Sequence, residues 1–365
     1  MKKIFYFTMI LSCIVGWKTY AQNLTIKGKI DCRDTLMILM GDGIVIDTLI
    51  SYNKEFMFQR KMKHPELLTI VAIKVNSREY AKKDFFIGAG DVVIESSFKE
   101  LNTTRIEMSD TRSQLKYSEF RSRFDPLVRI ARSIIDSSYV KEKSEAEKAV
   151  YRELYDRILE VENEVAELFV RENTDNIVGA FVLANYLREI DPNKIEGLIP
   201  LFSNELLNSR YLLLVKDRMI KKLDLKEGNP SPEFSLKGKD GIRINLNDLL
   251  GKYTVLDFWG TWCAPCIAGI QRMKEYHGKY ADRVNFIGIA CNDQERTWIS
   301  AIRKYQLNWP QYLNSYQGQD LTDLFQIEAF PTKIILDDKG RIIKIFRGET
   351  EEFYNFLDRT FQQDK

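Results

Sequence analysis

Two cysteines separated by two residues, Cys263 and Cys266, constrain this chain more than any other feature. The apolar and β-branched residues 253–258 before them predict a buried strand, and residues 267–280 predict a helix. The pair therefore lies where a strand ends and a helix begins. A thiolate there faces unpaired backbone N–H groups and the positive end of the helix dipole, which lowers its pKa. A C-x-x-C loop in this place allows a disulfide to form reversibly.

The length and charge of the chain bound its class. Its 365 residues predict two or three domains, and its formal charge is +2. Three of its basic residues, Lys2, Lys3 and Lys18, lie within the first 21, where there is no acid. The rest of the chain is near neutral, which gives no reason to expect nucleic acid or an anionic membrane surface as a partner.

The first 21 residues predict a secretory signal peptide. A basic start precedes the apolar run 4–17, and cleavage is expected after Ala21, with Gln22 as the mature start. A membrane anchor is the alternative, but the run is shorter than the roughly 20 residues that a spanning helix needs. A second alternative is a lipoprotein anchored at Cys13, which would leave a very short apolar region. We therefore expect export to the periplasm or cell envelope, an oxidising compartment.

The remaining cysteines and histidines do not predict a metal site or a disulfide framework. Outside the C-x-x-C pair, the mature chain has only Cys32 and Cys291, and its histidines are His64 and His277. A structural zinc site would need further ligands at suitable spacing. We expect neither a metal nor a cofactor. Cys291 could be a third redox thiol, although a buried small hydrophobe is the commoner outcome.

The pattern along the chain predicts three folded parts after the signal peptide. Residues 22–110 contain short predicted strands at 24–30, 35–40, 44–50, 67–73 and 84–94, which indicate a small antiparallel sandwich or barrel. We interpret it as a docking or spacer module rather than a catalytic one.

Residues 111–225 predict a helical region. An apolar stripe at spacings of three and four predicts one face of a long helix, and two more helices are expected at 177–187 and 205–220, with a break at Asp191-Pro192. A coiled-coil dimer and a helical bundle both fit, and the shortness of the repeat favours the bundle. The stripe consists of Val150, Leu154, Ile158, Val161, Val165 and Leu168.

Residues 226–365 predict an α/β domain. A Pro- and Gly-containing linker at 226–233 precedes a hairpin at 234–246 around Asp240-Gly241. Strands and helices then alternate, as in a βαβ core. Strands are expected at 284–290, 332–336 and 342–346, and helices at 295–305 and 349–361.

Residues 257–266, Asp-Phe-Trp-Gly-Thr-Trp-Cys-Ala-Pro-Cys, resemble the active-site signature of the thioredoxin superfamily. The preceding residues 251–257 and the hairpin are similar to its TlpA/ResA-like branch of extracytoplasmic thiol:disulfide oxidoreductases. This resemblance covers about the last third of the chain and implies a thioredoxin fold there. The predicted strands of 22–110 resemble the small β-domain found ahead of thioredoxin domains in Bacteroidetes-type exported proteins.

The resemblance implies a role for each site residue. Cys263, at the helix edge, would be the nucleophile, and Cys266 would be the more buried, resolving thiol. Asp257 matches the buried aspartate that accepts a proton from the resolving cysteine, and burial should raise its pKa. Trp259 and Trp262 would form an apolar collar around the pair.

The segment Phe330-Pro331 matches the superfamily's cis-proline, which faces the C-x-x-C loop. The backbone of Phe330 would then pair with an extended substrate, so Trp262, Phe330 and Pro331 are the expected substrate-binding residues. The residues alone fit an ordinary trans proline equally well.

Three positions depart from the family pattern. Gln271 stands where a helix-kinking proline is usual, Gly269 stands where many relatives have an acid, and strand 284–290 has no lysine to pair with Asp257. Peroxiredoxins, a sister family, place Thr three and Pro seven residues before their cysteine. Here Gly260 and Leu256 stand there, which disfavours a peroxidase.

These observations predict an exported thiol:disulfide reductase that contributes to redox homeostasis. Ala264-Pro265 lacks the histidine that is typical of strong oxidants in the family. The expected partners are exported proteins with oxidised cysteines and a thiol-reductant donor in the membrane. A disulfide isomerase, dimeric through the helical region, is one alternative. A binding or scaffold module with an inert disulfide is another.

Overall fold

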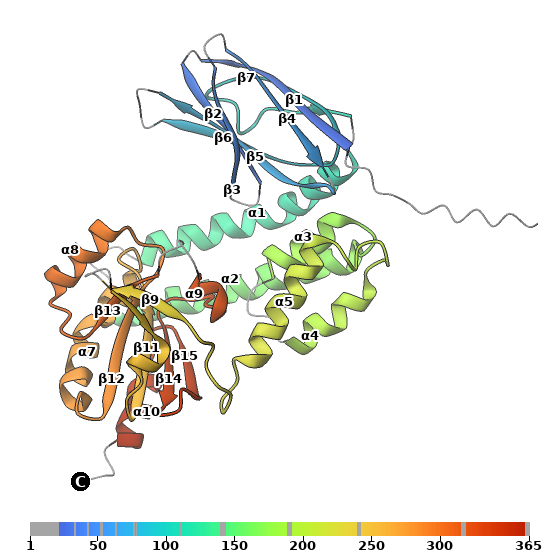
Figure 1. Ribbon diagram of the computed structural model, residues 1–365. Helices are drawn as coiled ribbons and strands as arrows, with labels where there is room; N and C mark the ends of the chain where they lie inside the picture. Colours follow the sequence, from blue (N-terminus) through green and yellow to red (C-terminus); the bar gives the residue numbers. More distant parts are fainter. Residues whose placement is uncertain are drawn as a thin grey trace, which may run out of the picture. The chain divides into compact units, whose positions relative to one another are not determined.

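The computed structural model describes residues 22–361, except for 33, 42–43, 52–53, 63, 76, 78, 110, 139–143, 188–191, 239–241 and 315–318. The predicted signal peptide, Cys13 and the predicted Asp240-Gly241 turn lie outside the described residues. The chain forms two compact units, Met1–Val182 and Leu183–Lys365 (Figure 1). The division into three separately folding parts, 22–110, 111–225 and 226–365, stays a prediction. No helix in the described part of the chain is both long and apolar enough to cross a membrane.

The β-part of the first unit consists of two four-stranded sheets, which confirms the predicted β-domain. One sheet has the order β4-β1-β7-β8 and the other β3-β2-β5-β6. The inward side chains of both sheets, such as Leu24, Ile70 and Phe85, are fully buried in one core. The strands are β1 (Gln22–Asp31), β2 (Thr35–Gly41), β3 (Ile44–Ser51), β4 (Glu55–Met62), β5 (Glu66–Lys74), β6 (Tyr80–Ile87), β7 (Gly90–Ser97) and β8 (Glu107–Met108).

Two features of this sandwich differ from the prediction. Strands β1 and β7 pair in parallel, although an antiparallel sheet was expected. Strand β4 was not predicted, because Glu55, Gln59, Arg60 and Lys61 dilute its apolar content. Phe56, Phe58 and Met62 on its inner face are buried, and Arg60 on the same face pairs with Glu66 (2.8 Å).

The helices of the first unit are α1 (Arg112–Ser138), α2 (Glu145–Glu172) and the start of α3 (Ile177–Asn185). The predicted apolar stripe on α2 is not its packed face. That face instead carries Ala166, Phe169 and Val170, and the Phe169 ring lies 5.1 Å from the ring of Phe120 on α1. Aromatic contacts between the two helices therefore set the rotation of α2. Three stripe residues are about half exposed: Val150 (55%), Leu154 (48%) and Leu168 (54%).

The second unit begins with the end of α3, which is followed by α4 (Pro192–Leu198), the 3₁₀ turn η1 (Ile199–Leu201) and α5 (Arg210–Asp224). Pro192 lies between the two predicted helices, as expected, and opens an additional helix, α4, where its fixed φ suits a first helical turn. The end of α5 is tied to the rest of this unit by ion pairs from Lys221 to Asp323 (2.6 Å) and from Lys222 to Glu328 (2.6 Å).

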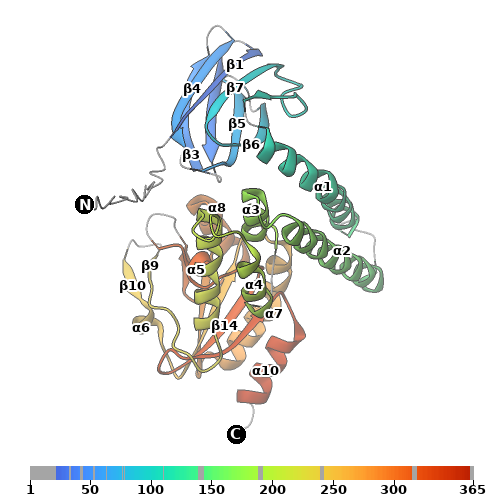
Figure 2. The same ribbon diagram turned by 90° about the vertical axis from the view of Figure 1, so that its right-hand side faces the viewer.

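A seven-stranded sheet forms the centre of the second unit, with the order β10-β9-β13-β12-β11-β14-β15. Its strands β9, β10 and β14 are labelled in Figure 2. Neighbours among β11, β12 and β13 are parallel, and the outer pairs are antiparallel. The predicted bounds of 284–290 and 295–305 match the structure. The elements are β9 (Ser235–Gly238), β10 (Arg243–Asn245), α6 (Leu246–Leu249), β11 (Tyr253–Trp259), α7 (Ala264–Tyr280), β12 (Val284–Ala290), α8 (Glu295–Tyr305), β13 (Gln311–Leu313), α9 (Leu321–Leu324), β14 (Thr332–Asp337), β15 (Ile342–Arg347) and α10 (Glu351–Phe361).

Each face of this sheet has its own apolar core. Val255 and Ile335 belong to the core that α7, α8 and α10 cover. Leu256 and Ile334, the next residues along their strands, belong to the core on the side of α6 and α9. Because side chains alternate along a strand, residues 257 and 333 belong to the α7 and α10 face.

Candidate active site

Strand β11 delivers the two cysteines to the start of helix α7. Cys263 is the N-cap residue of α7, and its Sγ accepts a hydrogen bond from the backbone N–H of Cys266 (3.2 Å). Pro265 lies in the first turn, where the missing N–H costs no helical hydrogen bond. The sulfur of Cys263 therefore lies at the positive end of the helix, where a thiolate is stabilised.

The structure contains a disulfide between Cys263 and Cys266. Cys266 was expected to be the more buried of the two, but the difference is absent. Cys263 is 4% exposed and Cys266 is 6% exposed. In this oxidised state the bond holds both side chains at the same depth.

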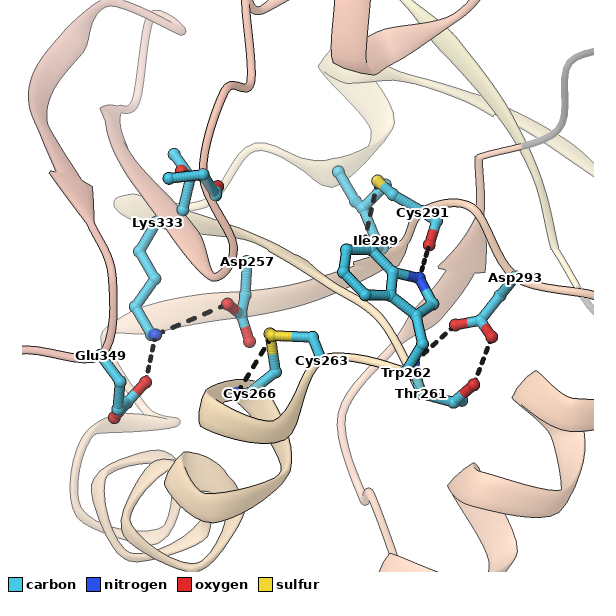
Figure 3. Close-up of a disulfide and its surroundings, with 12 residues drawn as sticks. Asp257, Thr261, Trp262, Cys263, Cys266, Ile289, Cys291, Asp293, Lys333 and Glu349 are labelled. Atoms are coloured by element: carbon cyan, nitrogen blue, oxygen red, sulfur yellow. Dashed lines mark hydrogen bonds and ion pairs between the residues drawn. A yellow bond between two sulfur atoms is a disulfide. The ribbon is translucent and has the colours of Figure 1, made fainter. Parts of the chain in front are cut away.

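The loop before Cys263 is anchored by Asp293, which the sequence did not indicate. The backbone N–H of Thr261 donates to one carboxylate oxygen of Asp293 (2.8 Å), and the Thr261 hydroxyl donates to the other (Figure 3). The hydroxyl of Thr297, in α8, also donates to this carboxylate (3.3 Å). Asp293 thus fixes the approach of the chain to the cysteine pair.

The two tryptophans near the cysteine pair have different places: Trp259 lines the cavity with Cys266, and Trp262 lies at the surface. Trp259 is buried, and its indole N–H donates to Oε1 of Gln311 (3.1 Å). Trp262 is 52% exposed, and its N–H donates to the carbonyl of Cys291 (2.9 Å). The ring of Trp262 meets that of Phe330 edge to face at 5.2 Å. Trp262 and Phe330 therefore form an apolar ledge beside the disulfide.

The Phe330–Pro331 peptide bond is cis, as the resemblance implied. Pro331 lines a cavity of about 20 Å³ that lies behind Cys266. This volume is about that needed for one water molecule. The structure thus brings Cys266, Asp257 and Pro331 to one cavity, while Trp262 and Phe330 lie on the ledge.

Asp257 lies in this cavity with a side chain that is only 14% exposed. Burial raises its pKa to about 6, Lys333 opposes that rise, and Glu349 adds to it. Lys333 stands opposite Asp257 in the register of β14 against β11, and its Nζ lies 3.8 Å from Oδ1 of Asp257. The lysine that strand 284–290 lacks is therefore supplied by a different neighbour of β11.

Glu349 is a second carboxylate that the sequence did not single out. Its Oε2 lies 2.8 Å from Nζ of Lys333, and its Oε1 accepts a hydrogen bond from the Tyr354 hydroxyl. A Cβ added at Gly269 would overlap this carboxylate. The glutamate thus occupies the space that a side chain at position 269 would need.

The other cysteine of this unit lies outside the disulfide. Cys291 is fully buried, and burial, followed by the charges of Asp320, Asp293 and Asp257, raises its pKa. A buried thiol that stays protonated fits a packing role better than a redox role. Within the described ranges, no group of three or more His, Cys, Asp or Glu side chains is placed to hold a metal ion.

Comparisons with known proteins agree with this geometry. Residues 228–345 match the model of the AhpC/TSA family. The chain is 30% identical to the thiol-disulfide oxidoreductase ResA of Halalkalibacterium halodurans over 128 residues, which are 35% of this chain and 72% of that protein. It is also 30% identical to the thioredoxin-like protein YneN of Bacillus subtilis over 131 residues, 35% of this chain and 75% of that one.

Among solved structures, a thiol:disulfide interchange protein from Bacteroides sp. is similar to this chain. It is 26% identical and has a TM-score of 0.35 over 39% of this chain and 94% of that one. The family match, residues 228–345, includes the cysteine pair. The chain therefore belongs to the ResA-like thiol-disulfide oxidoreductases, with a thioredoxin fold in its C-terminal part.

Proposed function

We propose that this protein reduces disulfide bonds of exported proteins, with Cys263 as the nucleophile and Cys266 as the resolving thiol. The observation that carries this proposal is the place of the Cys263 sulfur, which caps helix α7 and accepts the N–H of Cys266. A negative charge on that sulfur is stabilised by the same N–H and by the helix dipole. Cys266 instead faces the cavity that holds Asp257.

The reaction then has two exchange steps. The thiolate of Cys263 attacks a substrate disulfide, forms a mixed disulfide and releases one substrate sulfur as a thiolate. The Cys266 thiol gives its proton to the carboxylate of Asp257 and attacks Cys263. The second substrate sulfur leaves, and the Cys263–Cys266 disulfide remains. The substrate gains two electrons, and the protein loses them.

The cycle needs a thiol donor to restore the reduced pair. The predicted signal peptide places the protein outside the cytoplasm, so we propose a membrane thiol reductant as that donor. Ala264 and Pro265 put no imidazole beside the Cys263 thiolate. Without that cation the thiolate is less stabilised, which favours a reductant over a strong oxidant.

The ledge formed by Trp262 and Phe330 is the proposed substrate site. Half of Trp262 faces solvent, and the ring edge of one residue meets the face of the other. An extended substrate segment lying along Phe330 and Pro331 would bring its disulfide to Cys263 and place an apolar side chain on the ledge. This arrangement supports unfolded or flexible protein segments as substrates.

A trapping experiment tests the proposal. In Cys266→Ser the first exchange can occur but the second cannot, so reduced protein added to a disulfide-containing substrate should accumulate a mixed disulfide on Cys263. Cys263→Ser is the matched control and should trap nothing. If no mixed disulfide forms on Cys263 under these conditions, the exchange assignment fails and the binding or scaffold alternative is favoured.

The exposed apolar residues of α2 support one alternative, a dimeric disulfide isomerase. Val150, Leu154 and Leu168 are each about half exposed on that helix. Two copies paired along these residues could hold a misfolded substrate between them. Sedimentation of the full chain, together with the reactivation of a scrambled disulfide protein, distinguishes the two activities. A monomer that reduces the scrambled protein without reactivating it favours the reductase.

A further inference from the structure

A buried cation shared by two carboxylates lies behind Cys266. The Lys333 side chain is only 2% exposed, and its Nζ lies 2.8 Å from Oε2 of Glu349 and 3.8 Å from Oδ1 of Asp257 (Figure 3). One positive charge thus faces two negative ones when all three groups are ionised. Because a buried charge is strongly stabilised by its nearest partner, the two carboxylates compete for Lys333.

The structure holds Glu349 in this place from three sides. Gly348 has a φ of +78°, in the left-handed region that favours glycine, and it turns the chain from β15 toward the cavity. The Tyr354 hydroxyl donates to the Glu349 carboxylate. Gly269, on α7, leaves the space that the carboxylate fills. Glu349 is therefore a built part of the cavity wall and not a surface side chain that happens to reach it.

We infer that Glu349 is a positioning residue that draws Lys333 away from Asp257 and so leaves the Asp257 carboxylate a stronger base. This inference rests on the proposed role of Asp257 as the proton acceptor for Cys266. A stronger base at position 257 removes the proton of the resolving thiol more readily. Glu349 itself takes no part in the sulfur exchange.

The direction of the effect follows from the contacts. Lys333 makes a hydrogen-bonded ion pair with Glu349, whereas its distance to Asp257 exceeds hydrogen-bond range. Removing the Glu349 charge would take away a repulsion on the Asp257 carboxylate and leave Lys333 with Asp257 as its nearest carboxylate. Both changes lower the pKa of Asp257. The titratable groups that face Asp257 from the surrounding elements are Lys333 on β14, Glu349 after β15, Tyr354 on α10, Cys266 on α7 and Cys291, which follows β12.

The experiment measures the pKa of Asp257 by carboxyl-carbon NMR in the oxidised protein, where Cys263 and Cys266 do not titrate. Glu349→Gln should lower this pKa by about one unit, a tenfold change in the protonation equilibrium. Gly269→Ala should lower it as well, because the added methyl group displaces Glu349 while all charges remain. It serves as the second variant if Glu349→Gln does not fold. Lys333→Met should move the pKa in the opposite direction.

Two controls make the result specific. Glu349→Asp, with Tyr354 and Lys333 still in reach, should restore part of the wild-type pKa. Glu352→Gln removes a nearby exposed glutamate that pairs with Lys344 (2.9 Å) and should leave the pKa of Asp257 unchanged. An unchanged or raised pKa in both Glu349→Gln and Gly269→Ala would overturn the inference.

A kinetic measurement separates this inference from the proposed function. The rate at which Cys266 releases a preformed mixed disulfide is followed against pH in a single turnover. Because Asp257 is then a weaker base, Glu349→Gln should lower the rate at neutral pH about threefold. The acid limb of the pH–rate profile should move to lower pH by about one unit, as the pKa of Asp257 does. A lowered pKa with an unchanged profile would refute the role of Asp257 as proton acceptor, while absence of the mixed disulfide itself would refute the exchange function.

Discussion

Replacing Asp257 with asparagine should stabilise the oxidised protein at neutral pH, although it removes a residue of the proposed site. The pKa of Asp257 rises from 3.8 to about 6, mainly because its side chain is buried. A difference of about two units corresponds to about 3 kcal/mol at 1.36 kcal/mol per unit. Asparagine carries no charge, and Lys333 keeps its closer partner Glu349 at 2.8 Å.

The sign of this effect depends on pH. A carboxyl group with a raised pKa in the folded state contributes stability that is fully present below pH 3.8 and is lost as the pH rises through about 6. The wild-type protein should therefore lose up to about 3 kcal/mol relative to Asp257→Asn between pH 4 and pH 7.5. Contributions of groups that do not interact with Asp257 cancel in this difference.

Urea unfolding followed by tryptophan fluorescence measures the difference. Four of the five tryptophans, residues 259, 262, 298 and 309, lie in the second unit, so the signal follows that unit. Asp338→Asn, at an exposed turn position, is the control and should show no pH-dependent change relative to wild type. If the difference in unfolding free energy between wild type and Asp257→Asn stays constant from pH 4 to pH 7.5, burial does not disfavour the ionised form of Asp257 and the account is refuted.

Two further predictions concern the ledge and the packing of α10. Trp262→Ala should slow the reduction of a protein disulfide about tenfold, because a protein substrate needs the ledge. The reaction of Cys263 with a small disulfide reagent should change less than about twofold, and comparing the two rates checks the prediction. Asp358 accepts hydrogen bonds from Tyr276 (2.8 Å) and Lys279 (2.7 Å), and Asp358→Ala should cost about 2 kcal/mol in the same urea assay. Burial alone would raise the pKa of Asp358, but the hydrogen-bond donors around it outweigh burial and lower the pKa below 3.8. The contribution of Asp358 to the free energy of unfolding should therefore be lost as the pH falls below 3.8.

The sequence predicted the elements of the second unit well where the local pattern was strong. Strand 284–290 is almost wholly apolar, and helix 295–305 has a clear apolar period, so their bounds needed no tertiary information. Helix α2 shows the limit of such patterns. Its stripe is regular, yet aromatic contact with α1 buries a different face. Which face of a helix packs depends on a partner that the local sequence does not contain.

The sequence predicted those site residues that lie within the two recognisable segments, 257–266 and 330–331. Cys263, Cys266, Asp257 and Pro331 all come from segments with a recognisable pattern. Lys333 and Glu349 do not, because their roles depend on the register of β14 and on the turn after β15. One signal was available: Lys333 stands in a strand that is otherwise apolar except at its ends, and a buried lysine requires a charged partner.

The most direct test of the central claim is the titration of the Cys263–Cys266 pair against graded ratios of reduced and oxidised glutathione, with thiol labelling as the readout. A redox-active pair should pass from disulfide to dithiol with a midpoint above about −300 mV, the approximate limit below which structural disulfides resist glutathione. Variants that lack Cys32 or Cys291 should give the same midpoint. A pair that stays oxidised at every ratio would contradict the account and indicate a structural disulfide.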